Sequence, residues 1–143
     1  MKTLQQILNN KHNQGIISIA PSRPVYDALV ILAEYEIGAL AVIKDGNLVG
    51  IFSERDYARE IILQGRSSKS TLISEVMTDK VITANPADLV ESAMNTMLEK
   101  RIRHLPVVEN GKMLGMLSIG DVLKETIDYQ QELIRQLESY IHS

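Results

Sequence analysis

The sequence predicts an α/β (α+β) fold made of two consecutive β-α-β-β-α repeats, with a short helix at each end of the chain. The first observation is an internal repeat that holds one register without a gap. Its separation is 65 residues (111 − 46), and it matches Gly46, Gly50, Ser53 and Asp56 with Gly111, Gly115, Ser118 and Asp121. The second observation is that both copies show the same order of strand and helix patterns. The third is an aliphatic composition, with one Phe, five Tyr and no Trp in 143 residues.

Each repeat opens with a strand and a helix. Short β-prone runs lie at residues 16–19 and 81–83, each just before a proline. A helix is predicted over residues 24–36, because its apolar residues have the spacing of one helix face. The second copy repeats that spacing, so that Val25, Ala28, Leu29 and Leu32 correspond to Val90, Ala93, Met94 and Met97.

A hairpin and a second helix complete each repeat. Apolar strands at 39–43 and 48–52 enclose Asp45-Gly46, which is a good hairpin signal, and Asn110-Gly111 does the same in the second copy. Ser53 and Ser118 then stand where the N-cap of a following helix is expected.

The chain ends and the linker complete the organisation. Residues 3–10 and 129–142 are predicted to be short helices, and the second carries an apolar stripe of Leu133, Ile134, Leu137 and Ile141 that could cover the chain's own core or join a partner chain. One repeat of about 50 residues is too small to bury a good core, so we expect the two to pack by a pseudo-two-fold axis. A polar linker at 65–70 divides the chain into 1–70, repeat one with the N-terminal helix, and 71–143, repeat two with the C-terminal helix.

Composition argues against several classes of function. A net charge of −3 disfavours sequence-independent nucleic-acid binding, and the lack of cysteine excludes disulfides, zinc–thiolate sites and thiol nucleophiles. With no signal-like start and no run of roughly 20 apolar residues, we expect a cytoplasmic protein that binds neither nucleic acid nor membrane. Nothing supports an enzyme: the histidines at 12, 104 and 142 have no metal-ligand spacing, and no P-loop or Gly-x-Gly-x-x-Gly occurs.

The repeated pattern Gly-apolar-apolar-Ser-x-x-Asp, after an apolar strand and a glycine turn, resembles the CBS domain. It reads Gly50-Ile51-Phe52-Ser53-Glu54-Arg55-Asp56 and Gly115-Met116-Leu117-Ser118-Ile119-Gly120-Asp121. Two such domains in tandem resemble a Bateman module, here over residues 16–127, and the chain is similar to stand-alone CBS-pair proteins. The resemblance implies a regulatory module that binds an adenosine nucleotide (AMP, ADP, ATP or NAD(H)) and pairs into a homodimer.

The chemistry of such a ligand suits the repeated residues. Asp56 and Asp121 fit the ribose, because a carboxylate can accept both diol protons in charge-assisted bonds. Aliphatic walls and backbone groups at strand ends suit adenine. Ser53 and Ser118 stand at expected helix starts, where backbone N–H groups favour phosphate.

The resemblance also implies two unequal clefts, each joining the Ser-x-x-Asp of one repeat to the strand entrance of the other. Site one would use Ser53 and Asp56 with Ile82, Ile102, Arg103 and His104. Site two would use Ser118 and Asp121 with Ile17, Ile37, Gly38 and Ala39. Arg103 and His104 match the family's basic positions for phosphate, so site one is expected to prefer the more phosphorylated end of a ligand. Gly38 and Ala39 replace that pair in site two, where Arg55 could supply charge.

Each of these residues also has a plainer structural interpretation. Asp56 and Asp121 could simply stabilise the first turn of a helix. Arg103 could belong to a solvated basic patch, and His104 could be a half-buried histidine with a satisfied ring. The strand glycines Gly50 and Gly115 could allow close backbone approach, either for sheet packing or for a ligand.

Two functions of different class therefore fit the sequence. In the first, an adenosine ligand stiffens the clefts, biases the shape of a dimer and signals to a partner protein. In the second, the repeats form a ligand-independent protein–protein interaction scaffold whose contact surface is the C-terminal apolar stripe. The presence of Ser and Asp in both copies favours the first.

Overall fold

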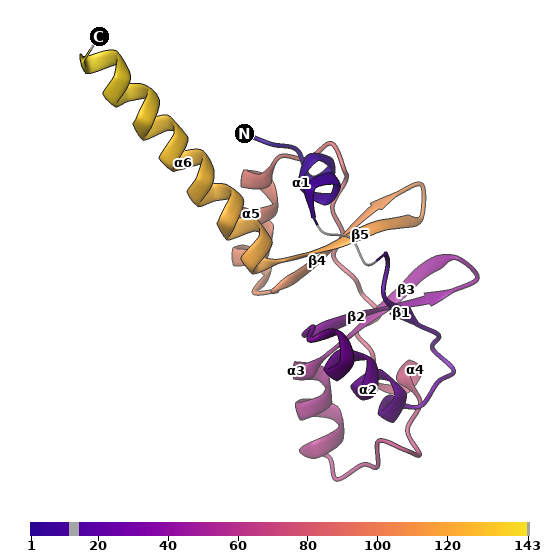
Figure 1. The fold of residues 1–143 in the computed structure, drawn as a ribbon. Coiled ribbons are helices and arrows are strands. Elements are labelled where there is room, and N and C mark those ends of the chain that lie inside the picture. Colours follow the sequence, from indigo (N-terminus) through magenta and orange to yellow (C-terminus); the bar gives the residue numbers. More distant parts are fainter. Residues whose placement is uncertain (12–14, 143) are drawn as a thin grey trace. The chain divides into compact units, whose positions relative to one another are not determined.

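The computed structural model describes residues 1–11 and 15–142, so His12 lies outside the described residues. The chain forms two compact units (Figure 1). Of the described residues, the first-repeat unit contains 15–82 and 110–113, and the second-repeat unit contains 1–11, 83–109 and 114–142. Helices and strands occur in both units, which confirms the mixed α+β class.

The first-repeat unit is built around a three-stranded sheet of order β1-β2-β3, in which β1 is parallel and β3 antiparallel to β2. Its elements are β1 (Ser18–Ile19), α2 (Val25–Tyr35), β2 (Ala39–Lys44), β3 (Asn47–Ser53), α3 (Glu54–Tyr57), the π-helical turn η1 (Ala58–Ile62) and α4 (Ile73–Val76). The helix predicted over 24–36 and both hairpin strands are confirmed.

The second-repeat unit repeats this plan on a smaller sheet. Its elements are α1 (Leu4–Asn10), α5 (Val90–Lys100), β4 (His104–Glu109), β5 (Lys112–Ser118), of which residues 112 and 113 are grouped with the first-repeat unit, and α6 (Ile119–His142). The strand predicted over 81–83 is wrong. Among the described residues of this segment only Ala84 pairs with β4, through an isolated parallel bridge to Val107 in which its N–H donates to the Pro106 carbonyl and its carbonyl accepts from the Val108 N–H, both at 2.9 Å.

Both hairpin predictions are confirmed by the backbone angles. Asp45 and Gly46 have φ of 51° and 81°, and Asn110 and Gly111 have φ of 53° and 77°. Two consecutive positive φ values define the type I′ turn, which twists in the sense that a two-residue hairpin requires. Asparagine, aspartate and glycine tolerate these angles best.

The cores of the two units match position by position. Pairs at the 65-residue separation that are buried on both sides include Val25 and Val90, Ala28 and Ala93, Leu32 and Met97, Leu40 and Leu105, Val42 and Val107, and Phe52 and Leu117. Each core is aliphatic apart from Phe52. The repeat therefore specifies an equivalent hydrophobic interior in each unit.

Each unit is completed by a segment from outside its own repeat. In the first-repeat unit, α4 buries Ile73 and Val76, and the Val25 N–H donates to the Thr71 carbonyl at 2.8 Å. In the second-repeat unit, α1 buries Leu4 and Ile7 in the same way, and the Val90 N–H donates to the carbonyl of residue 2 at 3.1 Å.

The compact units consequently do not coincide with the division into 1–70 and 71–143. That division remains a prediction about the chain. In space, the N-terminal helix belongs with the second repeat, and α1 buries Leu4 and Ile7 in that unit.

Helix α6 is longer than expected. It runs for 24 residues without a break, whereas the sequence suggested a helix after Ser118 and a separate one over 129–142. No proline follows Ser118, and the one later glycine, Gly120, lies in the first turn, so nothing interrupts the helix. Among the residues that the structure describes, no helix is both long and apolar enough to cross a membrane.

Candidate functional site

The helix start in the first-repeat unit is a capping box. The Asp56 N–H donates to Ser53 Oγ at 3.1 Å, and Asp56 Oδ2 accepts from the Ser53 N–H at 2.9 Å and from the Ser53 hydroxyl at 3.0 Å. These bonds satisfy backbone donors that the helix itself leaves without partners. The N-cap prediction for Ser53 is confirmed, and one role of Asp56 is the structural one.

A third residue donates a hydrogen bond to the Asp56 carboxylate. The Thr78 hydroxyl donates to Asp56 Oδ1 at 3.1 Å. Thr78 is held in place by paired backbone bonds with Ile51, of 2.8 and 2.9 Å. Sequence reasoning missed Thr78, because it follows α4 and lies outside the motif that repeats.

Gly50 explains how that segment comes so close to β3. A Cβ at residue 50 would lie 2.5 Å from Met77 Sδ and 3.1 Å from the Thr78 carbonyl oxygen. Of the two interpretations left open for this strand glycine, chain packing has direct support. Gly50 is therefore a condition for placing the Thr78 hydroxyl on Asp56.

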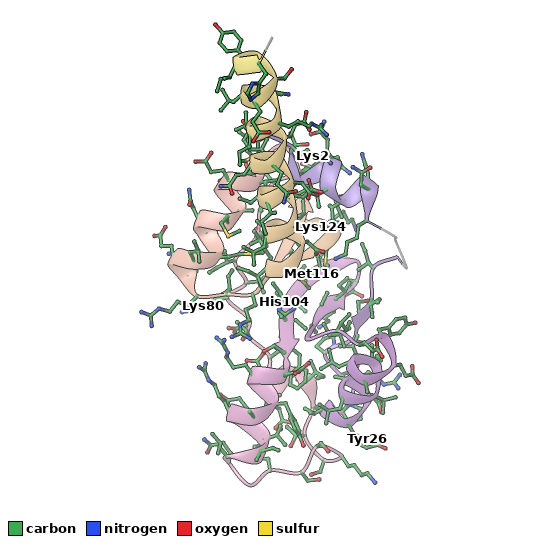
Figure 2. The ribbon with its side chains drawn as sticks, turned by 60° about the vertical axis from the view of Figure 1, so that its left-hand side comes forward. Lys2, Tyr26, Lys80, His104, Met116 and Lys124 are labelled. Carbon is green, nitrogen blue, oxygen red and sulfur yellow. The ribbon has the colours of Figure 1, made fainter. Side chains whose placement is uncertain are left out.

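The second-repeat unit has a matching helix start. Asp121 Oδ2 accepts from the Ser118 N–H at 2.8 Å, and the Asp121 N–H donates to Ser118 Oγ at 3.2 Å. Here the third partner is a cation: Lys11 Nζ lies 2.9 Å from Asp121 Oδ2 and also donates to the Met116 carbonyl at 2.9 Å. Figure 2 labels Met116, which lies on β5 just before the helix start. Lys11, like Thr78, was missed by sequence reasoning.

Opposing effects act on the pKa of the Asp121 carboxyl group. Partial burial raises the pKa of its carboxyl group, while the Ser118 N–H and the Lys11 ammonium lower it. The lowering contributions win, and the pKa lies below its ordinary value. Asp121 is accordingly an anion that its own unit already holds with a cation.

Each helix start also contacts the strand entrance of its own repeat. The Glu54 N–H donates to the Gly38 carbonyl at 3.1 Å, and the Ile119 N–H donates to the Arg103 carbonyl at 2.8 Å. Within one unit, Gly38 thus lies beside Ser53, and Arg103 lies beside Ser118. The Arg103 side chain is exposed, and His104 is half-buried at the start of β4.

The predicted site residues as a whole divide between the two units. The first-repeat unit holds Ile17, Ile37, Gly38, Ala39, Ser53, Arg55, Asp56 and Ile82, and the second-repeat unit holds Ile102, Arg103, His104, Ser118 and Asp121. Ala39 is buried, whereas Ile17, Ile37 and Ile82 are half-buried. Each predicted site combines residues of both units, and that combination stays a prediction.

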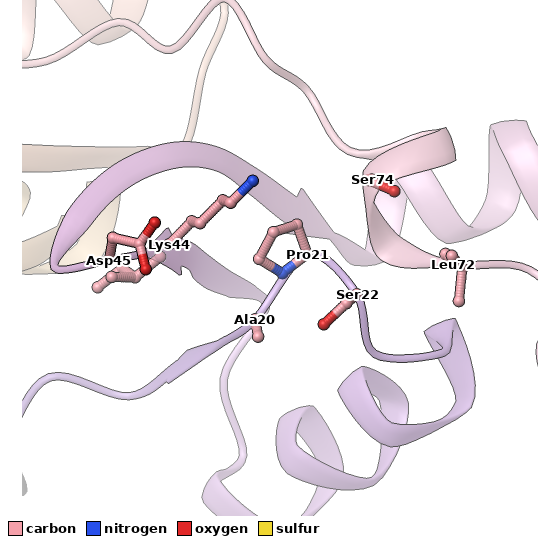
Figure 3. A pocket seen from close by; sticks show the side chains of 8 residues that line it. Ala20, Pro21, Ser22, Lys44, Asp45, Leu72 and Ser74 are labelled. Atoms are coloured by element: carbon pink, nitrogen blue, oxygen red, sulfur yellow. The ribbon is translucent and has the colours of Figure 1, made fainter.

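A surface hollow in the first-repeat unit lies away from these residues. It is lined by residues 20–22, residues 43–45, Leu72 and Ser74, so that hairpin-turn residues face the start of α4 (Figure 3). Ser53 pairs with Ala39 at the opposite end of the β2–β3 ladder. The hollow is therefore separate from the Ser53–Asp56 site.

Solved structures match the fold of most of the chain. A protein with CBS domains from Burkholderia ambifaria superimposes with a TM-score of 0.84 at 43% identity, covering 89% of this chain and 95% of that one. A CBS-domain containing protein from Agrobacterium tumefaciens gives a TM-score of 0.81 at 32% identity, covering 87% of this chain and 99% of that one.

Curated relatives agree in sequence. The mitochondrial CBS domain-containing protein CBSX3 of Arabidopsis thaliana is 46% identical over 122 residues, which cover 82% of this chain but only 59% of the plant protein. CBS domain-containing protein YhcV of Bacillus subtilis is 30% identical over 107 residues, 75% of this chain and 76% of that protein. The family model for the CBS domain matches residues 11–63 and again residues 73–128. The chain therefore belongs to the CBS-domain family of regulatory modules, with two copies of the domain.

Proposed function

We propose that this CBS pair is a sensor of adenosine nucleotides, AMP, ADP, ATP or NAD(H), that acts as a homodimer and signals to a partner protein. The observation that carries the proposal is the pair of aspartates, Asp56 and Asp121, each set at the first turn of a helix beside an N-cap serine. Family membership supports a regulatory role, and no catalytic step is proposed.

Carboxylate chemistry supports ribose binding at Asp56. A carboxylate offers about four lone-pair positions, and the Ser53 and Thr78 bonds use three of them. A ribose hydroxyl can add to Oδ1, and rotation of the Thr78 hydroxyl would admit a second. Capping and ligand binding are therefore compatible roles for one aspartate.

Phosphate specificity is assigned to Arg103. Its side chain is exposed, and its backbone carbonyl receives the Ile119 N–H at the helix start. A guanidinium forms paired, charge-assisted bonds with phosphate oxygens. We expect Arg103→Ala to weaken binding of AMP and ATP about tenfold and binding of adenosine less than twofold. Equal losses for nucleotide and nucleoside would remove Arg103 from the phosphate site.

The test is calorimetric titration of nucleotide-free protein with AMP, ADP, ATP, NAD and NADH. Asp56→Asn and Asp121→Asn keep an oxygen for the capping bond but lose the charge that strengthens a bond to ribose. Asp88→Asn is the matched control, because Asp88 Oδ2 accepts from the Asn85 N–H at 3.0 Å without being assigned to either site. Micromolar binding that Asp56→Asn or Asp121→Asn reduces, and Asp88→Asn does not, supports the sensor.

If none of these nucleotides binds the wild-type protein, the alternative function, a ligand-independent protein–protein interaction scaffold, is favoured. That alternative has an observation of its own, since Leu133, Ile134, Leu137 and Ile141 are all exposed. The cytoplasmic location expected from the sequence stays a prediction, and the closely similar plant relative is mitochondrial by name.

A further inference from the structure

Helix α6 carries two apolar faces, only one of which serves its own unit. Val122 is fully buried, and α5 packs along the same part of the helix. Lys2 Nζ lies 3.4 Å from Glu125 Oε2, which places the N-terminal segment on that side as well. A second row starts one residue after Val122, about 100° further around the helix. Its members are all exposed: Leu123, Ile127, Ile134, Leu137 and Ile141.

The second row has the spacing of a coiled coil. Counting from Leu123, the steps are 4, 7, 3 and 4 residues (127 − 123, 134 − 127, 137 − 134, 141 − 137), and Gln130 fills the gap within the step of seven. This places isoleucine at the a positions 127, 134 and 141, and leucine at the d positions 123 and 137. The row defines what we call the α6 seam, residues 123, 127, 130, 134, 137 and 141.

Among the described residues of the second-repeat unit, none covers this seam along its length. The exposed fraction rises from 45% at Leu123 to 72% at Ile141. Figures 1 and 2 show the C-terminal half of α6 extending beyond α1 and α5, which flank its first turns. The seam spans about 27 Å at 1.5 Å per residue, which is enough for a helical pair of five turns.

Charge beside the seam identifies its occupant. The e positions next to it are Lys124, Gln131 and Glu138. In an antiparallel pair of identical helices, e residues face e residues of the other copy. A register centred near residue 132 sets Lys124 against Glu138 of the second copy, and Glu138 against its Lys124. The surface is then complementary to itself, as a two-fold interface requires.

The same register fills the interior. It sets Ile127 against Leu137 of the second copy and Ile141 against its Leu123, while Ile134 meets Gln130. On the other flank, at the g positions, Leu133 meets Leu133 of the second copy. Apolar contact is thereby continuous except at the two glutamine layers.

A parallel pair would lose these matches. There, each e residue faces a g residue, and the g residues are Thr126, Leu133 and Tyr140, none of which is charged. Gln130 would also meet Gln130 inside the seam. The charges therefore favour the antiparallel arrangement.

We propose that two copies of this chain associate through the α6 seam as an antiparallel helical pair. This deepens the proposed homodimer by naming its surface and register, and it does not depend on nucleotide binding.

Disulfide trapping tests the register directly, since the chain has no cysteine of its own. Gln130→Cys and Ile134→Cys are made as separate full-length proteins and oxidised alone and mixed. The antiparallel register brings position 130 against position 134, so we expect a cross-linked dimer only in the mixture. A Gln130→Cys protein that cross-links with itself would show a parallel pair and overturn the proposal.

Charge reversal tests the flanking pairs by sedimentation. Lys124→Glu should weaken the dimer about tenfold, because it changes two symmetric attractions into repulsions. Adding Glu138→Lys to that variant should restore affinity to within about twofold of wild type. A double variant as weak as Lys124→Glu alone would overturn the pairing.

Wild-type sedimentation separates the possible failures. A monomeric wild type would remove both the seam and the homodimer. A dimer that Ile134→Asp leaves intact would keep the homodimer and remove the seam. Calorimetry on folded Ile134→Asp reports nucleotide binding independently, so the sensor can stand or fall by itself.

Discussion

The two helix starts share a motif and a capping geometry, yet they differ in the group that completes the aspartate. At Asp56 that group is the neutral Thr78 hydroxyl, and at Asp121 it is the Lys11 ammonium. Thr78 follows α4, the segment that packs on the first-repeat unit. Lys11 follows α1, the segment that packs on the second-repeat unit. The comparison teaches that the repeated sequence makes the two starts alike, and that residues outside the repeat make them chemically unequal.

The largest expected difference concerns the strand glycines. A Cβ at Gly50 meets Met77 Sδ and the Thr78 backbone oxygen, whereas a Cβ at Gly115 meets only the flexible Leu8 side chain, at 2.7 Å. We expect Gly50→Ala to lower the free energy of unfolding by about 3 kcal/mol and Gly115→Ala by about 1 kcal/mol. Urea unfolding measures both. Equal losses would mean that the two segments are held equally rigidly.

Lys11 offers the next largest effect, on ligand binding. Because its ammonium occupies Asp121 Oδ2, Lys11→Met should free the carboxylate for ribose and raise adenosine affinity there about three- to tenfold. Calorimetry in an Asp56→Asn background isolates this site. The same substitution in an Asp121→Asn background should change nothing, and any gain there would contradict the assignment.

Thr78→Val tests the neutral partner at Asp56. The valine keeps the shape but removes the hydroxyl, and since Thr78 is exposed we expect a stability loss of less than about 1 kcal/mol. Thermal unfolding measures it, with Thr96→Val as control, because the Thr96 hydroxyl bonds only to the Ser92 carbonyl within α5. A loss of several kcal/mol would give Thr78 a larger structural role than its bond suggests.

The smallest effect is a pH dependence confined to the charged pair. The folded pKa of Asp121 is lowered, so its contribution to stability is present above the unfolded pKa, near 4, and is lost as the pH falls through the folded value. The stability difference between wild type and Lys11→Met should therefore be greatest near neutral pH and disappear in acid. Both partners are partly exposed, at 42% and 26%, so we expect less than about 1 kcal/mol.

Urea unfolding at several pH values measures that difference. A gap between the two proteins that stays constant from neutral pH into strong acid would show that Lys11 acts through packing and not through charge.

Local patterns predicted the repeated parts of the molecule well. The apolar periodicity found α2 and α5, the Asp-Gly and Asn-Gly pairs found the hairpins, and the serine motif found both helix starts. These features depend on neighbours within a few residues, so they can be recognised from a single sequence. The α6 prediction went wrong only in assuming a break that no proline or glycine supplies.

The partners of the aspartates could not be found in this way. The segments that carry them do resemble each other, with Leu4 and Ile7 matching Ile73 and Val76, but their separation is 69 residues (73 − 4) and not 65. A search in one gapless register passes over that match. Lys11 lies 110 residues from Asp121 in the chain, and no local pattern indicates a contact at that separation.

The packing of α1 on the second repeat also sets an order of events during synthesis. Leu4 and Ile7 are made before the second repeat, but the unit that buries them includes α6, where Lys2 pairs with Glu125, 123 positions further on (125 − 2). At roughly 5–20 residues per second, that interval is on the order of ten seconds. Most of the first-repeat unit can form once α4 has emerged, whereas the apolar side chains of α1 stay exposed to solvent until the second repeat has been made.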